Sequence, residues 1–293
     1  MQLRGSYTAI VTPFAGDGLD VDSLRALARW HLEQGSTGVV ACGTTGEAAT
    51  LSAAETSQVV RACAEECHAR GKWCIAGAGT NSTAKTVENV RHAKEAGADA
   101  ALVVTPYYNK PTQEGLYRHY MKVAEAGLPV LAYNIPGRTA VDMLPETVAR
   151  LAKSGALAGI KEASGNISRA AEIVALAGEQ FAVLAGDDMF VVPTLSVGGQ
   201  GVISAVANVI PGDFAKMVES FHAGDARGAG RIQTRMAGLV KAMFAETNPQ
   251  PVKWALERMG RIKSGALRLP LITVQPESAA KIEAAMKAYG GLI

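Results

Sequence analysis

Short apolar or β-branched runs recur along the first two thirds of the chain, and amphipathic segments with helical spacing separate them. This alternation is typical of repeated strand–helix units that build a parallel sheet. The predicted strands cover residues 8–12, 38–42, 73–76, 101–105, 129–133, 157–161, 181–184 and 201–204.

The number of these runs favours a closed (β/α)8 TIM barrel over an open doubly wound sheet, and such a barrel has an expected size of about 250 residues. An open sheet also favours a Gly-rich turn after its first strand, whereas this chain has Thr12, Pro13 and Phe14 there. We therefore expect an α/β protein built on a TIM barrel.

Helical patterns alone follow Ser204. The predicted helices cover residues 211–223, 226–245, 251–259 and 276–288. The last three exceed what the eighth unit of a barrel needs. We expect a TIM-barrel catalytic domain over residues 1–225 and a small C-terminal helical domain over residues 226–293.

Several helix starts carry local signals. Ser52 and Glu55 have the spacing of a capping box, in which the two side chains satisfy unpaired N–H groups of the first turn. The pairs Asp22-Ser23 and Ser82-Thr83 are predicted to cap two further helices.

The composition suits one large α/β domain with an appendage: 48% of the 293 residues are hydrophobic and 19% are charged. The 29 Lys and Arg residues nearly balance the 27 Asp and Glu residues, so no large basic face is implied. Nucleic acid is therefore not an expected partner, whereas small anionic substrates are compatible with this charge.

Four cysteines, Cys42, Cys63, Cys67 and Cys74, form no CxxC pair and no ligand cluster with the histidines. We interpret them as buried thiols in a reducing compartment. The sequence contains neither the apolar segment of a signal peptide nor an apolar run of about 18 residues. We therefore expect a cytoplasmic protein without a membrane partner.

Lys161 lies at the end of the apolar run 155–160. Desolvation disfavours the charged form of an amine, and an uncharged amine is a nucleophile for carbonyl groups. Most other lysines lie in polar or helical stretches, where a solvated head group is the simpler interpretation.

The second predicted strand ends in Gly43-Thr44-Thr45-Gly46-Glu47. Barrel enzymes carry their chemistry at the carboxyl ends of the strands, where two hydroxyls and the N–H groups of a glycine loop can bind an anion. A helix cap made by Thr and Glu is the alternative, and the better capping box at Ser52 weakens it.

Tyrosines mark two other strand ends: Tyr107 and Tyr108 follow the fourth strand, and Tyr133 ends the fifth, with Arg138 five residues later. A phenol can relay protons, and a guanidinium can bind a carboxylate through two hydrogen bonds. A tyrosine at a strand end can instead have a purely structural role, with its ring buried and its hydroxyl in water. Arg138 could also pair with Asp142.

Two further motifs favour structural interpretations. Asp187 and Asp188 follow the seventh strand and could hold a metal, but adjacent Asp residues at a helix start more often cap it. The glycine-rich segment 198–201 precedes the eighth strand and therefore belongs to the face of the barrel opposite the chemistry. No nucleotide or metal pattern remains, so neither a cofactor nor a metal is predicted.

These residues together predict an imine-forming lyase that acts on a small keto acid. They also carry a family resemblance, since Gly43–Glu47, Tyr107–Asn109, Tyr133–Pro136, Gly159–Glu162 and Gly201–Ser204 occur in the family's order. The whole chain resembles the pyruvate-dependent class I aldolases of the dihydrodipicolinate synthase and N-acetylneuraminate lyase family. Thr44-Thr45 and the arginine loop are similar to the branch that serves bacterial lysine biosynthesis.

The resemblance implies that Lys161 forms a Schiff base with pyruvate, and that the resulting enamine attacks L-aspartate 4-semialdehyde to give 4-hydroxy-tetrahydrodipicolinate. Tyr133 would relay protons together with Thr44 and Tyr108. The implied substrate-binding groups are Thr45 for the pyruvate carboxylate, Arg138 for the semialdehyde carboxylate, and the backbone carbonyls of Gly186 and Ile203.

The resemblance also implies a homotetramer made of two tight dimers, with Tyr108 supplied by a neighbouring subunit. Lysine-inhibited members carry two histidines and a glutamate where this chain has Ala53, Thr56 and Lys85. A cation at Lys85 would repel the amine of lysine, so weak or absent feedback inhibition is expected.

Two alternatives remain open from the sequence. One is a sister lyase with the same imine but another aldehyde, such as a keto-deoxy sugar acid or 4-hydroxy-2-oxoglutarate. The other is a non-catalytic keto-acid sensor, which would be expected to lack at least one of Lys161, Tyr133 and Thr44.

Overall fold

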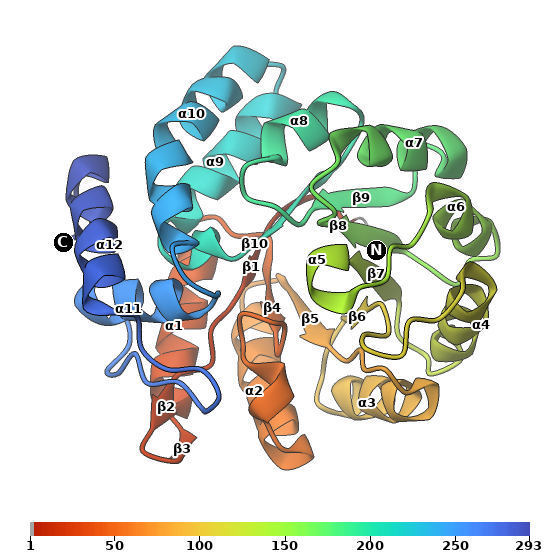
Figure 1. Cartoon of the computed structure of the whole chain (residues 1–293), viewed down its shortest axis with the longest axis horizontal. Helices are drawn as coiled ribbons and strands as arrows, with labels where there is room; N and C mark the ends of the chain where they lie inside the picture. The colour runs from red at the N-terminus through yellow and green to blue at the C-terminus, as the bar shows by residue number, and fades with distance from the viewer. Residues whose placement is uncertain (1–2) are drawn as a thin grey trace.

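The computed structural model describes residues 3–293 and contains a closed parallel barrel (Figure 1). The barrel strands are β1 (Gly5–Ala9), β4 (Gly38–Ala41), β5 (Trp73–Gly77), β6 (Ala100–Val104), β7 (Val130–Asn134), β8 (Gly159–Glu162), β9 (Ala182–Ala185) and β10 (Gly201–Ser204). The barrel closes because β1 pairs with both β4 and β10. A short hairpin of β2 (Phe14–Ala15) and β3 (Gly18–Leu19) follows β1.

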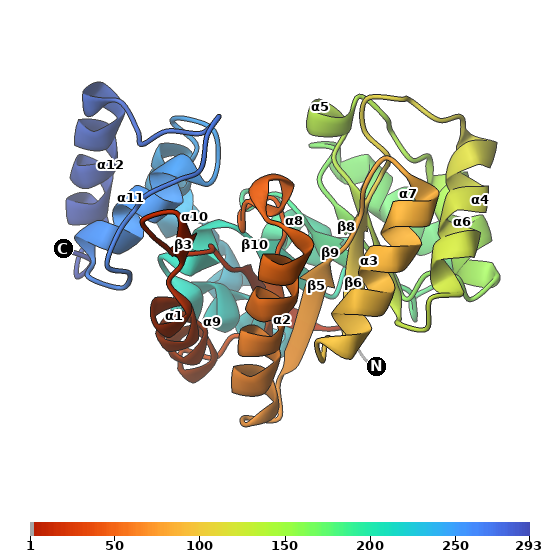
Figure 2. The same cartoon turned by 90° about the horizontal axis from the view of Figure 1, so that it is seen from below.

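Helices surround the barrel, and the C-terminal ones lie to one side of it (Figures 1 and 2). The surrounding helices are α1 (Val21–Glu33), α2 (Ala53–His68), α3 (Thr83–Glu95), α4 (Gln113–Ala124), α5 (Pro136–Thr139), α6 (Pro145–Lys153), α7 (Ile167–Ala177), α8 (Val191–Ser196) and α9 (Pro211–His222). The short 3₁₀ turns are η1 (Ala48–Thr50) and η2 (Val206–Asn208). The C-terminal helices are α10 (Ala226–Met243), α11 (Gln250–Arg258) and α12 (Pro276–Tyr289).

The predicted barrel is confirmed, and seven of its strands lie within two residues of their predicted bounds. The first strand is wrong: residues 8–12 were expected, but β1 covers Gly5–Ala9. Ile10 and Val11 are apolar because they pack into the core between barrel and helices. The N–H of Val11 donates to Oδ1 of Asn208 at 3.2 Å and is outside the strand ladder.

Two of the predicted caps are confirmed, and one is displaced. Ser52 and Glu55 form the capping box of α2, and Ser82 caps α3. Helix α1 is capped by Asp20, whose Oδ1 accepts from the N–H of Ser23 at 3.0 Å, so the cap predicted at Asp22-Ser23 is wrong. Ser23 lies three residues after Asp20, which is the position whose N–H group a helix-capping side chain accepts from.

Inward-facing side chains fill the barrel. Its interior cluster includes Tyr7, Val40, Leu184 and Ile203 together with Tyr133. In the register of the sheet, Lys161 on β8 pairs with Tyr133 on β7 and with Leu184 on β9. Since paired residues on adjacent strands share a face, the amine of Lys161 belongs to the barrel interior.

A buried ion pair ties the C-terminal helices to the loop after β4. Nζ of Lys253, on α11, lies 2.7 Å from Oε1 of Glu47, and both side chains are almost fully buried. Nζ also donates to the carbonyl of Thr12 at 2.9 Å, and the N–H of Arg268 donates to Oε2 of Glu47 at 3.0 Å. Burial lowers the pKa of Lys253, and the Glu47 carboxylate opposes that effect.

The core continues from the barrel into the C-terminal helices, because Leu239 and Ile282 belong to the same cluster as Val39 and Leu195. The connection between α9 and α10 covers residues 223–225. The division into domains at residue 225 stays a prediction.

The buried ion pair of Glu47 and Lys253 leads to a prediction about the stability of the fold. Lys253→Met leaves the Glu47 carboxylate buried without its cation, which costs about 3–5 kcal/mol of the free energy of unfolding. We expect a lower midpoint of urea unfolding, measured by circular dichroism. The double variant Glu47→Gln with Lys253→Met should recover part of the loss, because no charge is then buried.

Lys287→Met is the control for this prediction, since Lys287 forms an exposed pair with Glu283 and exposed pairs contribute little. Equal midpoints for Lys253→Met and Lys287→Met would contradict the prediction.

Candidate active site

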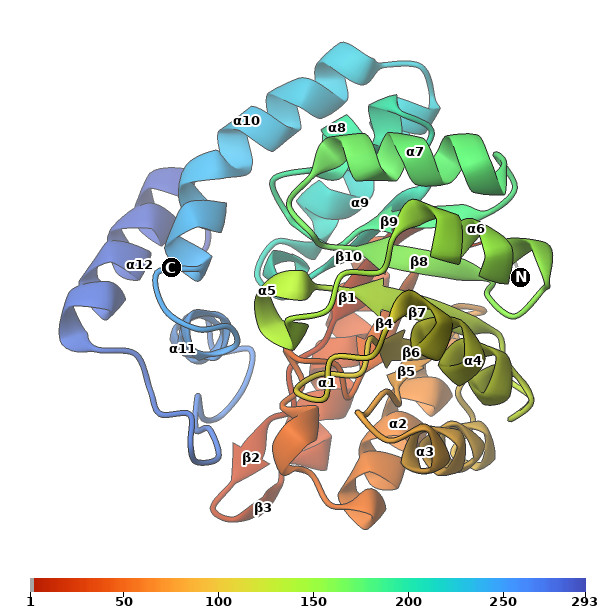
Figure 3. The same ribbon diagram turned by 45° about the vertical axis from the view of Figure 1, so that its right-hand side comes forward.

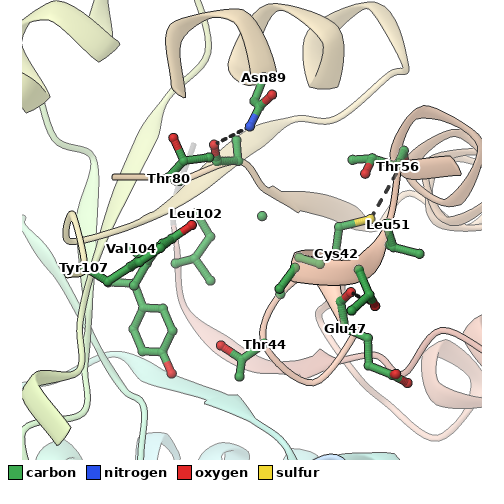
Figure 4. Close-up of a pocket in the computed structure, with 18 of the residues that line it drawn as sticks. Cys42, Thr44, Glu47, Leu51, Thr56, Thr80, Asn89, Leu102, Val104 and Tyr107 are labelled. Atoms are coloured by element: carbon green, nitrogen blue, oxygen red, sulfur yellow. Dashed lines mark hydrogen bonds between the residues drawn. The ribbon is translucent and has the colours of Figure 1, made fainter. Parts of the chain in front are cut away.

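A cavity of about 670 Å³ opens at the carboxyl ends of the barrel strands. It is lined by the ends and following loops of β4, β5, β6 and β7, by residues of α2 and α3, and by parts of the C-terminal segment, including Asn248 and Leu271. Thr44 lies at one side of the cavity, and Val104 and Tyr107 lie opposite Cys42 and Leu51 (Figure 4). This is the end of a TIM barrel that carries chemistry.

Lys161 lies beside Tyr133, which lines this cavity. The amine Nζ is 4.3 Å from the centroid of the Tyr133 ring, and Lys161 is only 7% exposed. No carboxylate of residues 3–293 lies within 4.0 Å of this nitrogen. The amine therefore faces the ring of Tyr133, with no counter-ion within salt-bridge distance.

Gly186 lies next to Lys161. A Cβ atom added to Gly186 would lie 3.0 Å from Cγ of Lys161 and 2.7 Å from Cβ of Ala163, so a larger residue would crowd the lysine. Ile203 is fully buried in the interior cluster that also contains Tyr133. The structure therefore places Gly186 against Lys161, and Ile203 in the same interior cluster as Tyr133.

Asp187 and Asp188 do not cap the next helix, so that interpretation of the pair is wrong. Helix α8 begins at Val191 behind Phe190, and Asp187 instead closes a turn by accepting from the N–H of Met189 at 2.9 Å. Asp188 is buried and accepts from the hydroxyl of Ser204.

Burial raises the pKa of Asp188 to about 6, opposed by the Ser204 hydrogen bond and by the charge of Lys161. Across residues 3–293, no group of three or more His, Cys, Asp or Glu side chains is arranged to hold a metal.

The polar residues of the loop after β4 lie in different surroundings. Thr44 lines the cavity, whereas Thr45 is buried and its Oγ1 accepts from Nδ2 of Asn248 at 2.9 Å. Glu47 has a left-handed backbone with φ of 55°, and its carboxylate forms the buried ion pair with Lys253. The Thr–Glu capping alternative is wrong, because the helix cap is Ser52.

Arg138 lies on α5 at the cavity and is exposed. Its Nη2 donates to the backbone carbonyl of Asn248 at 3.4 Å. Asp142 is instead paired with Arg169 at 2.9 Å, so the alternative pairing of Arg138 with Asp142 is wrong. Figure 3 shows α5 facing the connection between α10 and α11, which contains Asn248.

Tyr108 is not brought to Lys161 within this chain. It is 88% exposed, its φ of 74° is left-handed, and it does not line the cavity, whereas the neighbouring Tyr107 does.

Sequence reasoning missed Asn248. This residue contacts both Thr45 and Arg138, yet it lies about 200 and 110 positions away from them. An Asn before a Pro between two helices is an ordinary turn signal, so nothing local marks it as a site residue.

The four cysteines are buried and free, as predicted, within the described residues. Burial raises the pKa of the Cys42 thiol to about 12. None of the helices between residues 3 and 293 has the length and apolar character needed to cross a bilayer.

Comparisons with known proteins agree with this geometry. Residues 2–289 match the family described as the dihydrodipicolinate synthetase family. A 4-hydroxy-tetrahydrodipicolinate synthase of Anaeromyxobacter sp. (strain K) is 52% identical over 291 residues, which cover 99% of this chain and 98% of the relative.

Two solved structures are also similar. A dihydrodipicolinate synthase of Acinetobacter baumannii, described as chloride-inhibited and complexed with pyruvate, has 43% identity and a TM-score of 0.95 over 99% of this chain and 100% of its own. A structure described as a monomeric dihydrodipicolinate synthase variant has 41% identity and a TM-score of 0.96 over 100% of this chain and 98% of its own. The chain therefore belongs to the dihydrodipicolinate synthetase family.

Proposed function

We propose that this protein has 4-hydroxy-tetrahydrodipicolinate synthase activity and, as a class I Schiff-base lyase, condenses pyruvate with L-aspartate 4-semialdehyde in lysine biosynthesis. The relatives carry the name of this activity over almost the full length of the chain. The observation that carries the proposal is the buried amine of Lys161, which lies 4.3 Å from the centroid of the Tyr133 ring and forms no salt bridge among residues 3–293. These findings favour it over the sister lyase and the sensor.

Lys161 begins the reaction. Its amine attacks the keto carbon of pyruvate and water leaves, which gives a positively charged imine. The methyl group beside the imine loses a proton, and the resulting enamine carbon bonds to the aldehyde carbon of the semialdehyde. The amine of the semialdehyde then displaces Lys161, which closes the ring and releases 4-hydroxy-tetrahydrodipicolinate.

The proposed carboxylate-binding groups are those that the family resemblance implies. The hydroxyl of Thr45 and neighbouring N–H groups of its loop bind the pyruvate carboxylate, and the carbonyls of Gly186 and Ile203 line the pocket around the imine. Arg138 stands further out on α5, where its exposed guanidinium can meet the carboxylate of the second substrate.

The proton relay consists of Tyr133, Thr44 and Tyr108. Tyr133 and Thr44 line the same cavity, which supports their part in it. Tyr108 is exposed and does not line the cavity of its own chain, so in this relay it acts in the site of a neighbouring subunit. Such a relay requires at least a dimer, and the family resemblance implies a homotetramer made of two tight dimers.

Reductive trapping tests the imine. The native protein incubated with pyruvate and borohydride should gain the mass of one reduced pyruvate adduct per chain, measured by mass spectrometry, and Lys161→Ala should gain none. An unmodified native protein would overturn the proposed chemistry. Trapping followed by an aldehyde screen would reveal a sister lyase if another aldehyde reacted faster than the semialdehyde.

Subunit mixing tests the role of Tyr108. Tyr108→Phe should lower turnover by about 10²-fold, a typical contribution of a proton-transferring group. Mixing refolded Tyr108→Phe and Lys161→Ala chains in equal amounts should restore about a quarter of native activity, because half of random dimers then contain one complete site. Activity no higher than that of the separate variants would show that Tyr108 does not act on its neighbour.

Lys85 lines the same cavity as Thr56 and Ala53, and it pairs with Glu88 at 3.1 Å. A cation at this wall repels the amine of free lysine, so we propose weak feedback inhibition.

Assays with added lysine test this proposal. Half-inhibition of the purified enzyme should require more than millimolar lysine, and Lys85→Glu should lower that concentration severalfold by replacing repulsion with attraction. Lys85→Gln is the control for removing the charge alone. Half-inhibition of the native enzyme at sub-millimolar lysine would refute the proposal.

A further inference from the structure

Asn248 contacts both groups that bind carboxylates in the proposed function. It lies in the connection between α10 and α11 and is 7% exposed. Its side-chain Nδ2 donates to Oγ1 of Thr45 at 2.9 Å, and its backbone carbonyl accepts from Nη2 of Arg138 at 3.4 Å. One residue of the C-terminal segment therefore touches the predicted sites for both substrates.

The side-chain contact determines what the Thr45 hydroxyl can do. A hydroxyl has one proton to donate and lone pairs to accept with, whereas a carboxylate only accepts. Because the amide N–H of Asn248 occupies a lone pair of Oγ1, the proton of Thr45 stays free for a carboxylate. If the amide oxygen faced Thr45 instead, it would take up that proton.

The orientation of this amide depends on Thr45. Oδ1 of Asn248 is buried and finds no hydrogen-bond partner in the described chain, so no second contact holds the amide group. A carboxylate that accepts the proton of Thr45 favours the orientation with Nδ2 toward Oγ1. Substrate binding and the amide orientation therefore support each other.

The two ends of this hydrogen bond are fixed by the buried ion pair. Glu47 lies two residues after Thr45, and Lys253 lies five residues after Asn248. Their contact holds α11 against the loop after β4. Arg138 lacks an ion-pair partner within residues 3–293, so the carbonyl of Asn248 is the contact that directs its guanidinium.

We propose that Asn248 is a positioning residue for pyruvate recognition: its side-chain amide keeps the Thr45 hydroxyl a donor toward the pyruvate carboxylate, while its backbone carbonyl directs Arg138 toward the second carboxylate. The inference rests on the proposed function. It assigns a part of substrate recognition to the C-terminal helical segment.

Side-chain substitution separates the two contacts, because Asn248→Ala keeps the backbone carbonyl. The pyruvate concentration for half-maximal reductive trapping, and the KM for pyruvate, should both rise by about tenfold or more, which corresponds to one lost hydrogen bond to a charged group. The KM for the semialdehyde and kcat should change by less than about twofold. Asn248→Asp should raise the KM for pyruvate further, because a carboxylate takes the Thr45 proton and repels the substrate.

A double-mutant cycle with Thr45→Val makes the test specific. In the Thr45→Val background, Asn248→Ala should cause no further rise in the KM for pyruvate, because the hydroxyl through which Asn248 acts is gone. Gln250→Ala is the matched control: Gln250 is 8% exposed, lies two residues away and donates to Glu246, so its loss should leave the KM for pyruvate unchanged.

Additive effects of Asn248→Ala and Thr45→Val, or equal effects of Asn248→Ala and Gln250→Ala, would overturn the inference. If the native protein traps pyruvate but the effects of the two substitutions add, the role of Asn248 is contradicted and the proposed function is not. A native protein that traps no pyruvate would contradict the proposed function itself. Unfolding midpoints of all variants show whether a change reflects the site or the fold.

Discussion

The closure of the barrel through β1 is the constraint on which the site depends. Since β1 pairs with both β4 and β10, the carboxyl ends of all barrel strands meet at one rim. The β7–β8 register then sets Lys161 opposite Tyr133. A slip of one residue would turn the lysine toward the surrounding helices, because side chains alternate between the two faces of a strand. The chemistry of the amine is thus a property of the sheet register.

The pair of Glu47 and Lys253 extends this constraint to the C-terminal helices. A buried ion pair offsets its desolvation only when further hydrogen bonds satisfy the charges, and here the carbonyl of Thr12 and the N–H of Arg268 do so. Such a pair also specifies a single geometry, because its directional contacts leave few alternatives for α11. The helices beyond the barrel therefore set the position of Asn248, and through it the hydrogen bonding at Thr45.

Sequence reasoning succeeded where the physical signal is local. Alternating strands and helices predicted the barrel, and the apolar run before Lys161 predicted the buried strand end on which this residue lies. It failed for Ile10 and Val11, whose apolar side chains predict a strand but pack in the core between the barrel and the helices after β1 has ended. It also failed for Asn248 and Lys253, whose partners are at least 110 positions away, because such contacts leave no periodic pattern in the chain.

The exposed position of Tyr108 has a physical consequence. A left-handed φ costs a bulky residue about 1–3 kcal/mol, so it persists only where its surroundings determine it. Both Tyr108 and Lys110 have positive φ, and Asn109 between them donates to the carbonyl of Asn81 at 2.8 Å, which anchors the loop to the segment before α3. In this anchored loop Tyr108 is exposed and does not line the cavity of its own chain. A relay that includes Tyr108 thus requires a second chain, and the assembly then belongs to the catalytic machinery as much as Lys161 does.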